Sequence, residues 1–177
     1  MHPPAGNAGR FKKGSDKRNC RPLLPPDFRP DAFSVNNIEG MKILLSGTAS
    51  DSHTWNLVYL GLFLEERGYD VVALGPCVSP RLLTAACRRH TPDVVVLSSV
   101  NGHGNRDALA AVRALRAEPG PAALPVVVGG KLGTAGRSGE AESARLREAG
   151  CDAVLGDGAG DLEALCSFLA ARARVVA

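Results

Sequence analysis

Five repeats of a short apolar run followed by a helical pattern, from Met41 onward, constrain the fold of this chain most strongly. Each apolar run has the length of a strand, and the segment after it has the residue spacing of a helix packed on one side. Repeated strand–helix units favour a parallel sheet with helices on both faces. The sequence therefore predicts an α/β domain.

The expected strands are Lys42–Ser46, Asp70–Leu74, Val94–Leu97, Pro125–Val128 and Asp152–Leu155. The expected helices are Trp55–Arg67, Arg81–His90, Arg106–Ala117, Glu140–Ala149 and Leu162–Ala173. Ser79 before Pro80 is a typical helix start, and we expect Asn105 and Asp161 to cap two later helices. The pattern fits a flavodoxin-like (Rossmann-like), doubly wound, five-stranded parallel sheet in the order 2-1-3-4-5, with its ligand crevice between strands 1 and 3.

Residues 1–40 differ in composition from the rest of the chain. They hold six of the 12 Pro and seven Lys/Arg against four Asp/Glu, whereas residues 41–177 hold fourteen of each charge. Such a segment buries too little apolar surface to fold alone. We expect a disordered tail over residues 1–40, or a start of translation at Met41, and a single domain over residues 41–177.

The same composition bears on the class of protein. A domain with balanced charge offers no basic face for nucleic acid, and no apolar run has the length of a membrane span. The five Cys are scattered and form no C-x-x-C pair, which fits a reducing cytoplasm. An arm around Arg10 to Lys13 that binds a partner is an alternative to a plain disordered tail.

The loops after the first, third and fourth strands open on one edge of the predicted sheet. The first carries Asp51 and His53. An Asp two residues before a His can bond one ring nitrogen and leave the other free for a metal. The alternative is that Asp51 caps the following helix and His53 is a polar loop residue.

The other two loops are rich in small residues. They comprise residues 98–104 and 129–136. Small residues let a large ligand approach the backbone, and the hydroxyls of Ser98, Ser99 and Thr134 are available to bond its polar groups. The second loop lacks the ending of a phosphate-binding P-loop, and no G-x-G-x-x-G follows the first strand.

These motifs together resemble those of the cobalamin-binding domain family, which carries D-x-H-x-x-G, S-x-L and G-G after successive strands. The local context is most similar to the small subunit of glutamate mutase (methylaspartate mutase), with S-D-x-H and S-S-L-x-G-x-G. The matching residues here are Ser50–His53 and Ser98–Gly104. The resemblance covers Met41 to about Ala173.

The resemblance implies that adenosylcobalamin binds with its own base detached from cobalt. His53 would be the lower axial cobalt ligand and Asp51 its hydrogen-bonded partner, and these two are the expected catalytic pair. Ser98 would bond the detached nucleotide tail, which passes close to Gly129 and Gly130. The implied cofactor-binding residues are Ser50, Asp51, Ser52, His53, Thr54, Ser98, Ser99, Val100, Gly129, Gly130, Lys131, Leu132, Gly133, Thr134 and Ala135.

Two positions depart from the family's pattern. The motif Gly is Asn56 here, and the motif Leu is Val100. The change to Val100 is a small adjustment of volume. We expect the Asn56 side chain to crowd the nucleotide tail, because it adds atoms where the family has a close-approach Gly. His103 falls at a variable position of the pattern and is expected to be exposed near the corrin rim.

The resemblance implies half of an enzyme. The expected partner is a separate large TIM-barrel subunit that holds the substrate, and the expected reaction is the rearrangement of glutamate to 3-methylaspartate. The alternatives are a corrinoid methyl carrier and a cobalamin-sensing module, each of which is expected to need an additional domain. A flavodoxin-like domain without a cofactor is a further alternative.

Overall fold

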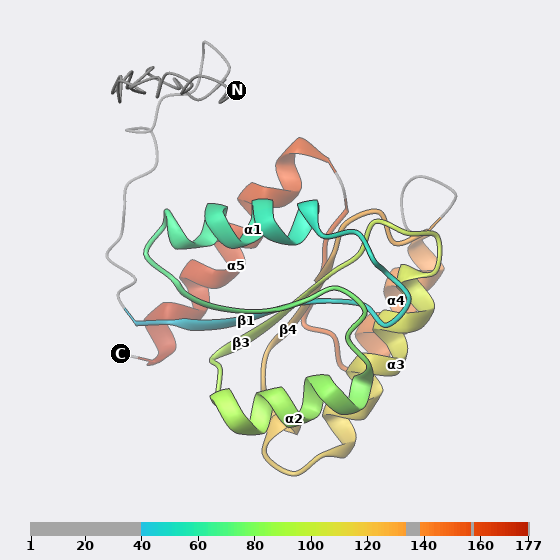
Figure 1. The fold of residues 1–177 in the computed structure, drawn as a ribbon, viewed down its shortest axis with the longest axis horizontal. Coiled ribbons are helices and arrows are strands. Elements are labelled where there is room, and N and C mark those ends of the chain that lie inside the picture. The colour runs from blue at the N-terminus through green and yellow to red at the C-terminus, as the bar shows by residue number, and fades with distance from the viewer. Residues whose placement is uncertain (1–39, 134–138, 157, 177) are drawn as a thin grey trace, which may run out of the picture. The chain divides into compact units, whose positions relative to one another are not determined.

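The sheet has five parallel strands in the order β2-β1-β3-β4-β5, which confirms the predicted order (Figure 1). The computed structural model describes residues 40–133, 139–156 and 158–176, so the expected disordered tail lies outside the described residues except for Gly40. The strands are β1 Lys42–Gly47, β2 Asp70–Gly75, β3 Val94–Ser98, β4 Val126–Gly129 and β5 Ala153–Val154.

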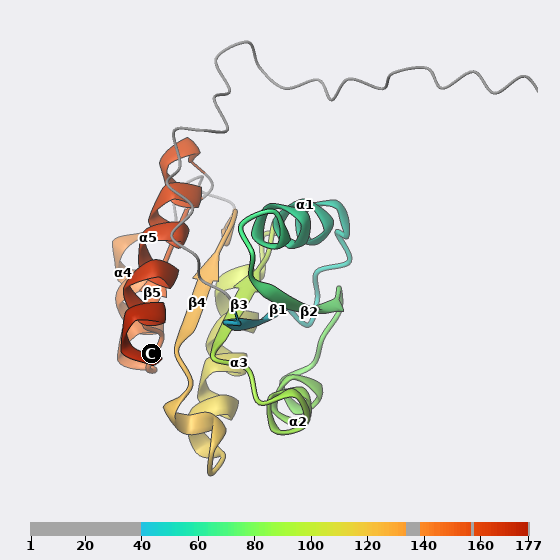
Figure 2. The same ribbon diagram turned by 90° about the vertical axis from the view of Figure 1, so that its left-hand side faces the viewer.

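Helices cover both faces of this sheet. They are α1 Trp55–Glu65, α2 Pro80–His90, α3 Gly104–Ala117, α4 Glu140–Glu148 and α5 Ala159–Val176, with a short 3-10 turn, η2, at Pro121–Ala123. Helices α1 and α5 pack on one face, and α2, α3 and α4 pack on the other (Figures 1 and 2). Of the described helices, none combines the length and apolar character needed to cross a bilayer.

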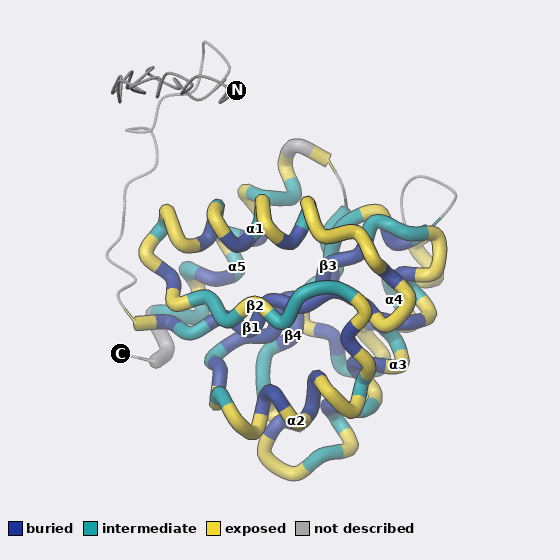
Figure 3. The backbone as a smooth tube through the Cα atoms, viewed as in Figure 1, coloured by how far each residue is buried: buried dark blue, intermediate teal, exposed yellow. Residues whose placement is uncertain are grey.

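Successive side chains along each strand point to opposite faces of the sheet, so each strand contributes to the two hydrophobic cores on these faces. In β1, Ile43 and Leu45 face the core under α1 and α5, whereas Leu44 faces the core under α2 and α3. Strand β3 is buried along its whole length, while the edge strand β2 is half-buried to exposed, as Figure 3 shows. The central strands are therefore mainly apolar, which is typical of a parallel sheet covered on both sides.

Two helix starts differ from the prediction. Helix α3 begins at Gly104, so Asn105 lies inside it and its amide donates to the Glu142 carboxylate of α4 (3.0 Å) instead of capping α3. Asp161 lies in the first turn of α5 and accepts from the Gly158 N–H (2.7 Å). The predicted cap Ser79 is confirmed, because its hydroxyl accepts from the Leu82 N–H (3.3 Å).

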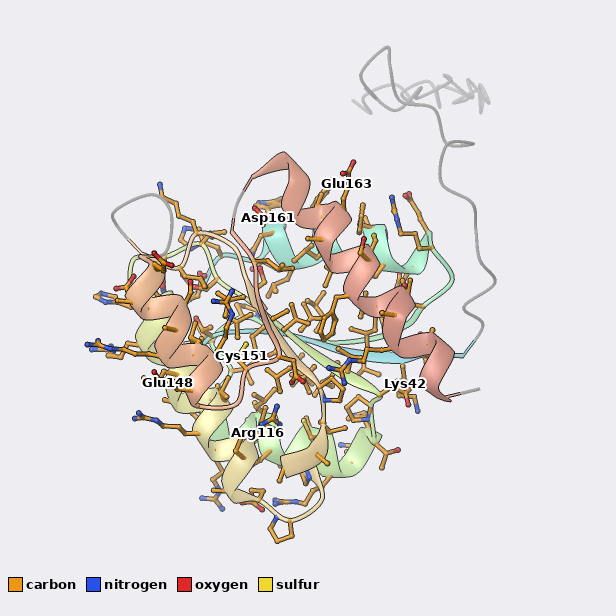
Figure 4. All side chains as sticks on the ribbon, turned by 180° about the vertical axis from the view of Figure 1, so that it is seen from behind. Lys42, Arg116, Glu148, Cys151, Asp161 and Glu163 are labelled. Atoms are coloured by element: carbon orange, nitrogen blue, oxygen red, sulfur yellow. The ribbon has the colours of Figure 1, made fainter. Side chains whose placement is uncertain are left out.

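Arg116 joins α3 to the segments around β4 and β5. It reaches the region of Cys151 in Figure 4, where it donates to the Gly150 carbonyl (2.6 Å) and to the Asp152 carboxylate (3.0 Å). It also donates to the Leu124 carbonyl (2.8 Å), just before β4. This guanidinium satisfies carbonyls that the loops would otherwise leave unpaired.

Candidate functional site

Asp51 connects the loops that follow β1 and β3. Its carboxylate is only 2% exposed, and one oxygen accepts from the Ser99 hydroxyl (2.8 Å) and the Val100 N–H (2.7 Å). The other oxygen accepts from the backbone N–H of His53 (2.9 Å) and from its ring Nδ1 (2.7 Å). The two loops can meet because Gly47 and Ser98 are paired at the ends of these neighbouring strands. Asp51 is therefore a buried side chain that holds the two loops together.

These hydrogen bonds keep Asp51 ionised. Burial alone would raise its pKa, but the N–H groups of His53 and Val100, the Ser99 hydroxyl and the His53 ring together hold the pKa below the usual value of an Asp carboxyl group. The hydrogen bonds lower the pKa by more than burial raises it, because each of them favours the charged form of the carboxyl group. Asp51 is thus a carboxylate at neutral pH.

His53 is held at one ring nitrogen and open at the other. Nδ1 donates to the Asp51 carboxylate, and Nε2 has no partner within the described part of the chain. The His53 side chain is 62% exposed, so the ring stands at the surface of the site. This bond fixes the tautomer with a lone pair on Nε2, which is the form that binds a metal. Among the described residues no group of three or more His, Cys, Asp or Glu could form a metal site of their own.

Two supports of this loop were not predicted from the sequence. The carboxylate of Asp107, on α3, accepts from the Ser50 backbone N–H (2.8 Å). The Cys77 N–H, in the loop after β2, donates to the Asp51 carbonyl (2.9 Å). A sequence signal existed for Asp107, because an Asp at the start of a helix on the same edge can reach a loop N–H.

A cavity of about 360 Å³ lies between the sheet and helices α1 and α5, and its lining includes Val100, whose N–H donates to Asp51. Strands β3 and β4 form its floor, and residues of α1, α5 and the loop after β5 form its walls. The lining residues are Asn56, Tyr59, Leu60, Val96, Leu97, Ser98, Val100, Val127, Gly129, Gly130, Leu155, Gly156, Gly158, Asp161, Leu162 and Leu165. Its size and mostly apolar lining suit a small-molecule ligand with a flat apolar part.

The contribution of α5 to this cavity was not predicted. The segment from Gly156 to Asp161 follows the fifth strand, and three Gly among its residues are a signal of the same kind as Gly129 and Gly130. The predicted site comprised only the loops after the first, third and fourth strands. Asp161 is labelled near the start of α5 in Figure 4.

The predicted site residues fall into separate groups. Ser98, Val100, Gly129 and Gly130 line the cavity, and Asp51 and His53 form the pair at the edge of the sheet. Ser50, Ser52 and Thr54 are exposed on the same loop, as is His103 on the loop after β3. Thr134 and Ala135 lie outside the described residues.

Three predicted residues have other surroundings. The Ser99 hydroxyl is used by Asp51 and is not available to a ligand in this structure. Leu132 is completely buried in the core under α2 and α3, and Lys131 is exposed. Neither these two nor Gly133 lines the cavity, because the chain turns away from it at Gly130, which has a φ of +99°.

Gly130 is needed for this turn itself. A Cβ added there would lie 2.3 Å from the Ser99 carbonyl oxygen, and the positive φ disfavours any side chain. A Cβ on Gly129 would instead make an ordinary contact of 3.5 Å with Leu155. Gly130 therefore packs the loop after β4 against the loop after β3.

Asn56 lies at the cavity wall, on the first turn of α1. Its Nδ2 donates to the Ser98 hydroxyl oxygen (3.0 Å), and its Oδ1 is buried without a hydrogen-bond partner among the described residues. Asn56, which replaces the motif Gly, thus lines the cavity. The resemblance to the family implies that the nucleotide tail lies close to this position. Trp55, next to it, is 84% exposed.

The chain matches the family model "B12 binding domain" over residues 41–166. It belongs to the B12 binding domain family. This match covers most of the described domain, including both loops joined by Asp51.

Curated relatives include two glutamate mutase sigma subunits. The one from Fusobacterium nucleatum is 30% identical over 115 residues, which cover 64% of this chain and 82% of the relative. The one from Haloarcula marismortui is 29% identical over 114 residues, covering 63% and 73%. The HTH-type transcriptional repressor CarA of Myxococcus xanthus is 37% identical over 92 residues, but the chain spans only 31% of its length.

Solved structures agree on the fold. A cobalamin-binding protein from Desulfitobacterium hafniense is 26% identical with a TM-score of 0.57, over 72% of this chain and 58% of that one. The monomethylamine corrinoid protein of Methanosarcina barkeri has a TM-score of 0.58 at 17% identity, over 76% and 61%. The chain is thus a cobalamin-binding domain that is related to glutamate mutase sigma subunits.

Proposed function

We propose that this chain is the cofactor-binding subunit of an adenosylcobalamin-dependent carbon-skeleton mutase, of the type that converts glutamate to 3-methylaspartate. The observation that carries the proposal is the Asp51–His53 pair, 2.7 Å apart, at the edge of a sheet with an apolar cavity beside it. The relationship to glutamate mutase sigma subunits supports the type of mutase.

The residues of the site fit a base-off corrinoid. A neutral imidazole nitrogen is a suitable ligand for a first-row metal such as cobalt, and the carboxylate bonded to Nδ1 makes the ring a better donor. The cavity offers apolar walls for a detached aromatic base, and Ser98 and Asn56 offer polar contacts there. In this proposal His53 would ligate the cobalt, and the cavity would hold the nucleotide tail.

Adenosylcobalamin supplies a radical by homolysis of its cobalt–carbon bond. The chain's own residues bind and orient the cofactor. Asp51 holds the proton on Nδ1 of His53, and Ser99 and Val100 hold Asp51 in place. A separate large subunit would bind the substrate and bring it to the cofactor. The chain alone is then inactive.

Ligation is tested with the Co(II) form of the bound corrinoid. In the wild type we expect nitrogen superhyperfine splitting in the electron paramagnetic resonance spectrum from a protein imidazole. His53→Ala should abolish it, while His103→Ala, which removes the other exposed His on this edge, should leave it unchanged. Retention of the same protein-nitrogen splitting in His53→Ala would refute the assignment.

The reaction is tested by mixing the chain with adenosylcobalamin and the large subunit of a glutamate mutase. Formation of 3-methylaspartate, lost in His53→Ala, is the expected result. The second candidate is a regulatory module, because the repressor CarA is 37% identical over the shared segment. Corrinoid binding with His53 ligation but no turnover with large subunits from several sources would favour that candidate.

A further inference from the structure

Two polar side chains face the mainly apolar cavity side by side. Asn56, on α1, donates through Nδ2 to the hydroxyl oxygen of Ser98, at the end of β3 (3.0 Å), and both residues line the cavity. Of the other polar side chains in the lining, Asp161 accepts from the Gly158 N–H and Tyr59 is 57% exposed. The pair of Asn56 and Ser98 therefore dominates the polar character of this wall.

The pair has unused hydrogen-bonding capacity. Asn56 Oδ1 is buried and has no partner among the described residues. The Ser98 oxygen accepts from Asn56, and its own hydrogen has no acceptor in the described part of the chain. Turning the Asn56 amide by 180° would exchange the positions of Oδ1 and Nδ2. At least one donor and one acceptor of the pair would still have no partner. A buried polar atom without a partner is costly, so a ligand that supplies an acceptor and a donor together suits this wall.

We propose that Asn56 and Ser98 make this chain select a corrinoid by its lower base, favouring one with an amino group beside a ring nitrogen, such as adenine, over 5,6-dimethylbenzimidazole. The ring nitrogen would accept from one member of the pair and the amino group would donate to the other. Detached dimethylbenzimidazole has one acceptor nitrogen and no N–H donor, so the Asn56 oxygen would stay unpaired. This inference rests on the proposed corrinoid binding.

In this proposal Asn56, which stands in place of the family's motif Gly, determines which lower base is bound. A Gly at that position would leave the Ser98 hydroxyl alone, which suits a base with a single acceptor. An Asn adds a second hydrogen-bonding group and occupies space next to it. The expected crowding of a dimethylbenzimidazole tail and the expected preference for an aminopurine tail are two results of the same side chain.

The test measures dissociation constants for three corrinoids with the full chain. They are cobalamin, its analogue with adenine as the lower base, and cobinamide, which has no nucleotide. The wild type should bind the adenine analogue at least about tenfold more tightly than cobalamin, the cost of one unpaired buried group. Asn56→Gly should reverse this order by tightening cobalamin binding and weakening binding of the adenine analogue.

Asn56→Leu is the matched control for size. It has the same number and branching of heavy atoms as Asn, in a somewhat larger side chain, but removes the hydrogen bonds, so it should weaken binding of the adenine analogue without improving that of cobalamin. Both variants should bind cobinamide like the wild type, and thermal melting of the apo proteins checks that they are folded. If Asn56→Leu keeps the adenine preference, hydrogen bonding is not its cause.

The outcomes separate the two proposals. A wild type that binds cobalamin as tightly as the adenine analogue overturns the base preference, while cobinamide binding that depends on His53 leaves the proposed function intact. A wild type that binds none of the three corrinoids overturns both.

Discussion

At the scale of single residues, Asp107 supports the loop that presents His53 without belonging to any motif. It is 8% exposed, and its carboxylate accepts from the Ser50 N–H next to Asp51 (2.8 Å). The position of His53 therefore depends on a side chain from α3 as well as on Asp51. A residue of this kind orients the ligand without touching it.

We expect Asp107→Ala to lower the free energy of unfolding by about 1–3 kcal/mol, because the Ser50 N–H loses its acceptor. Asp107→Asn, which keeps an acceptor oxygen, should lose less. Urea unfolding of the apo protein measures both. The Ala variant should also weaken corrinoid binding, and equal stability of the two variants would show that the hydrogen bond to Ser50 contributes little.

At the scale of elements, Arg116 connects α3 to the segments that precede β4 and β5. One guanidinium bonds the carbonyls of Ala122, Leu124 and Gly150 as well as the Asp152 carboxylate. Gly150, with a φ of +103°, leaves room for it, since a Cβ there would lie 2.7 Å from Arg116 Nε. The short strand β5 is positioned partly by this side chain.

Arg116→Lys should therefore destabilise the domain by about 2 kcal/mol, because a single ammonium group cannot bond several carbonyls in fork geometry. Arg113→Lys, at an exposed position of the same helix, should change stability by less than about 0.5 kcal/mol. Chemical denaturation compares the two. A loss at Arg116 as small as that at Arg113 would mean that water replaces the guanidinium.

The strand order and helix types could be predicted because each depends on local periodicity and on a general rule for parallel sheets. Element ends depended on individual contacts. Asn105 looks like a cap in the sequence, but Glu142, 37 residues away, provides its partner. The Asp51–His53 pair could be expected because it is local. The bond from Ser99 to Asp51 could not, because it joins distant segments. Asp107 and the Gly-rich segment at the start of α5 gave a signal of their own position, but not of the distant segments that they contact.

At the scale of the whole molecule, the domain and the segment before it are expected to act independently. Within the described part of the chain, the residues that line the cavity and those that hold Asp51 come from positions after 41. The binding function should therefore be contained in the domain.

A chain that starts at Met41 should bind cobalamin with the affinity of the full chain. Isothermal titration of both proteins under the same conditions measures this. A loss of more than about tenfold, or ~1.4 kcal/mol, would show that residues 1–40 contribute to the site.

The position of Trp55 gives the molecule a built-in optical reporter. It is the only Trp in the sequence, it is 84% exposed, and it stands two residues after His53. A corrin absorbs light over the range in which indole emits, so a corrinoid ligated by His53 would quench the intrinsic fluorescence of the protein by energy transfer. Loading with any corrinoid could then be followed without a label, and a second protein that covers α1 would shift the colour of the remaining emission.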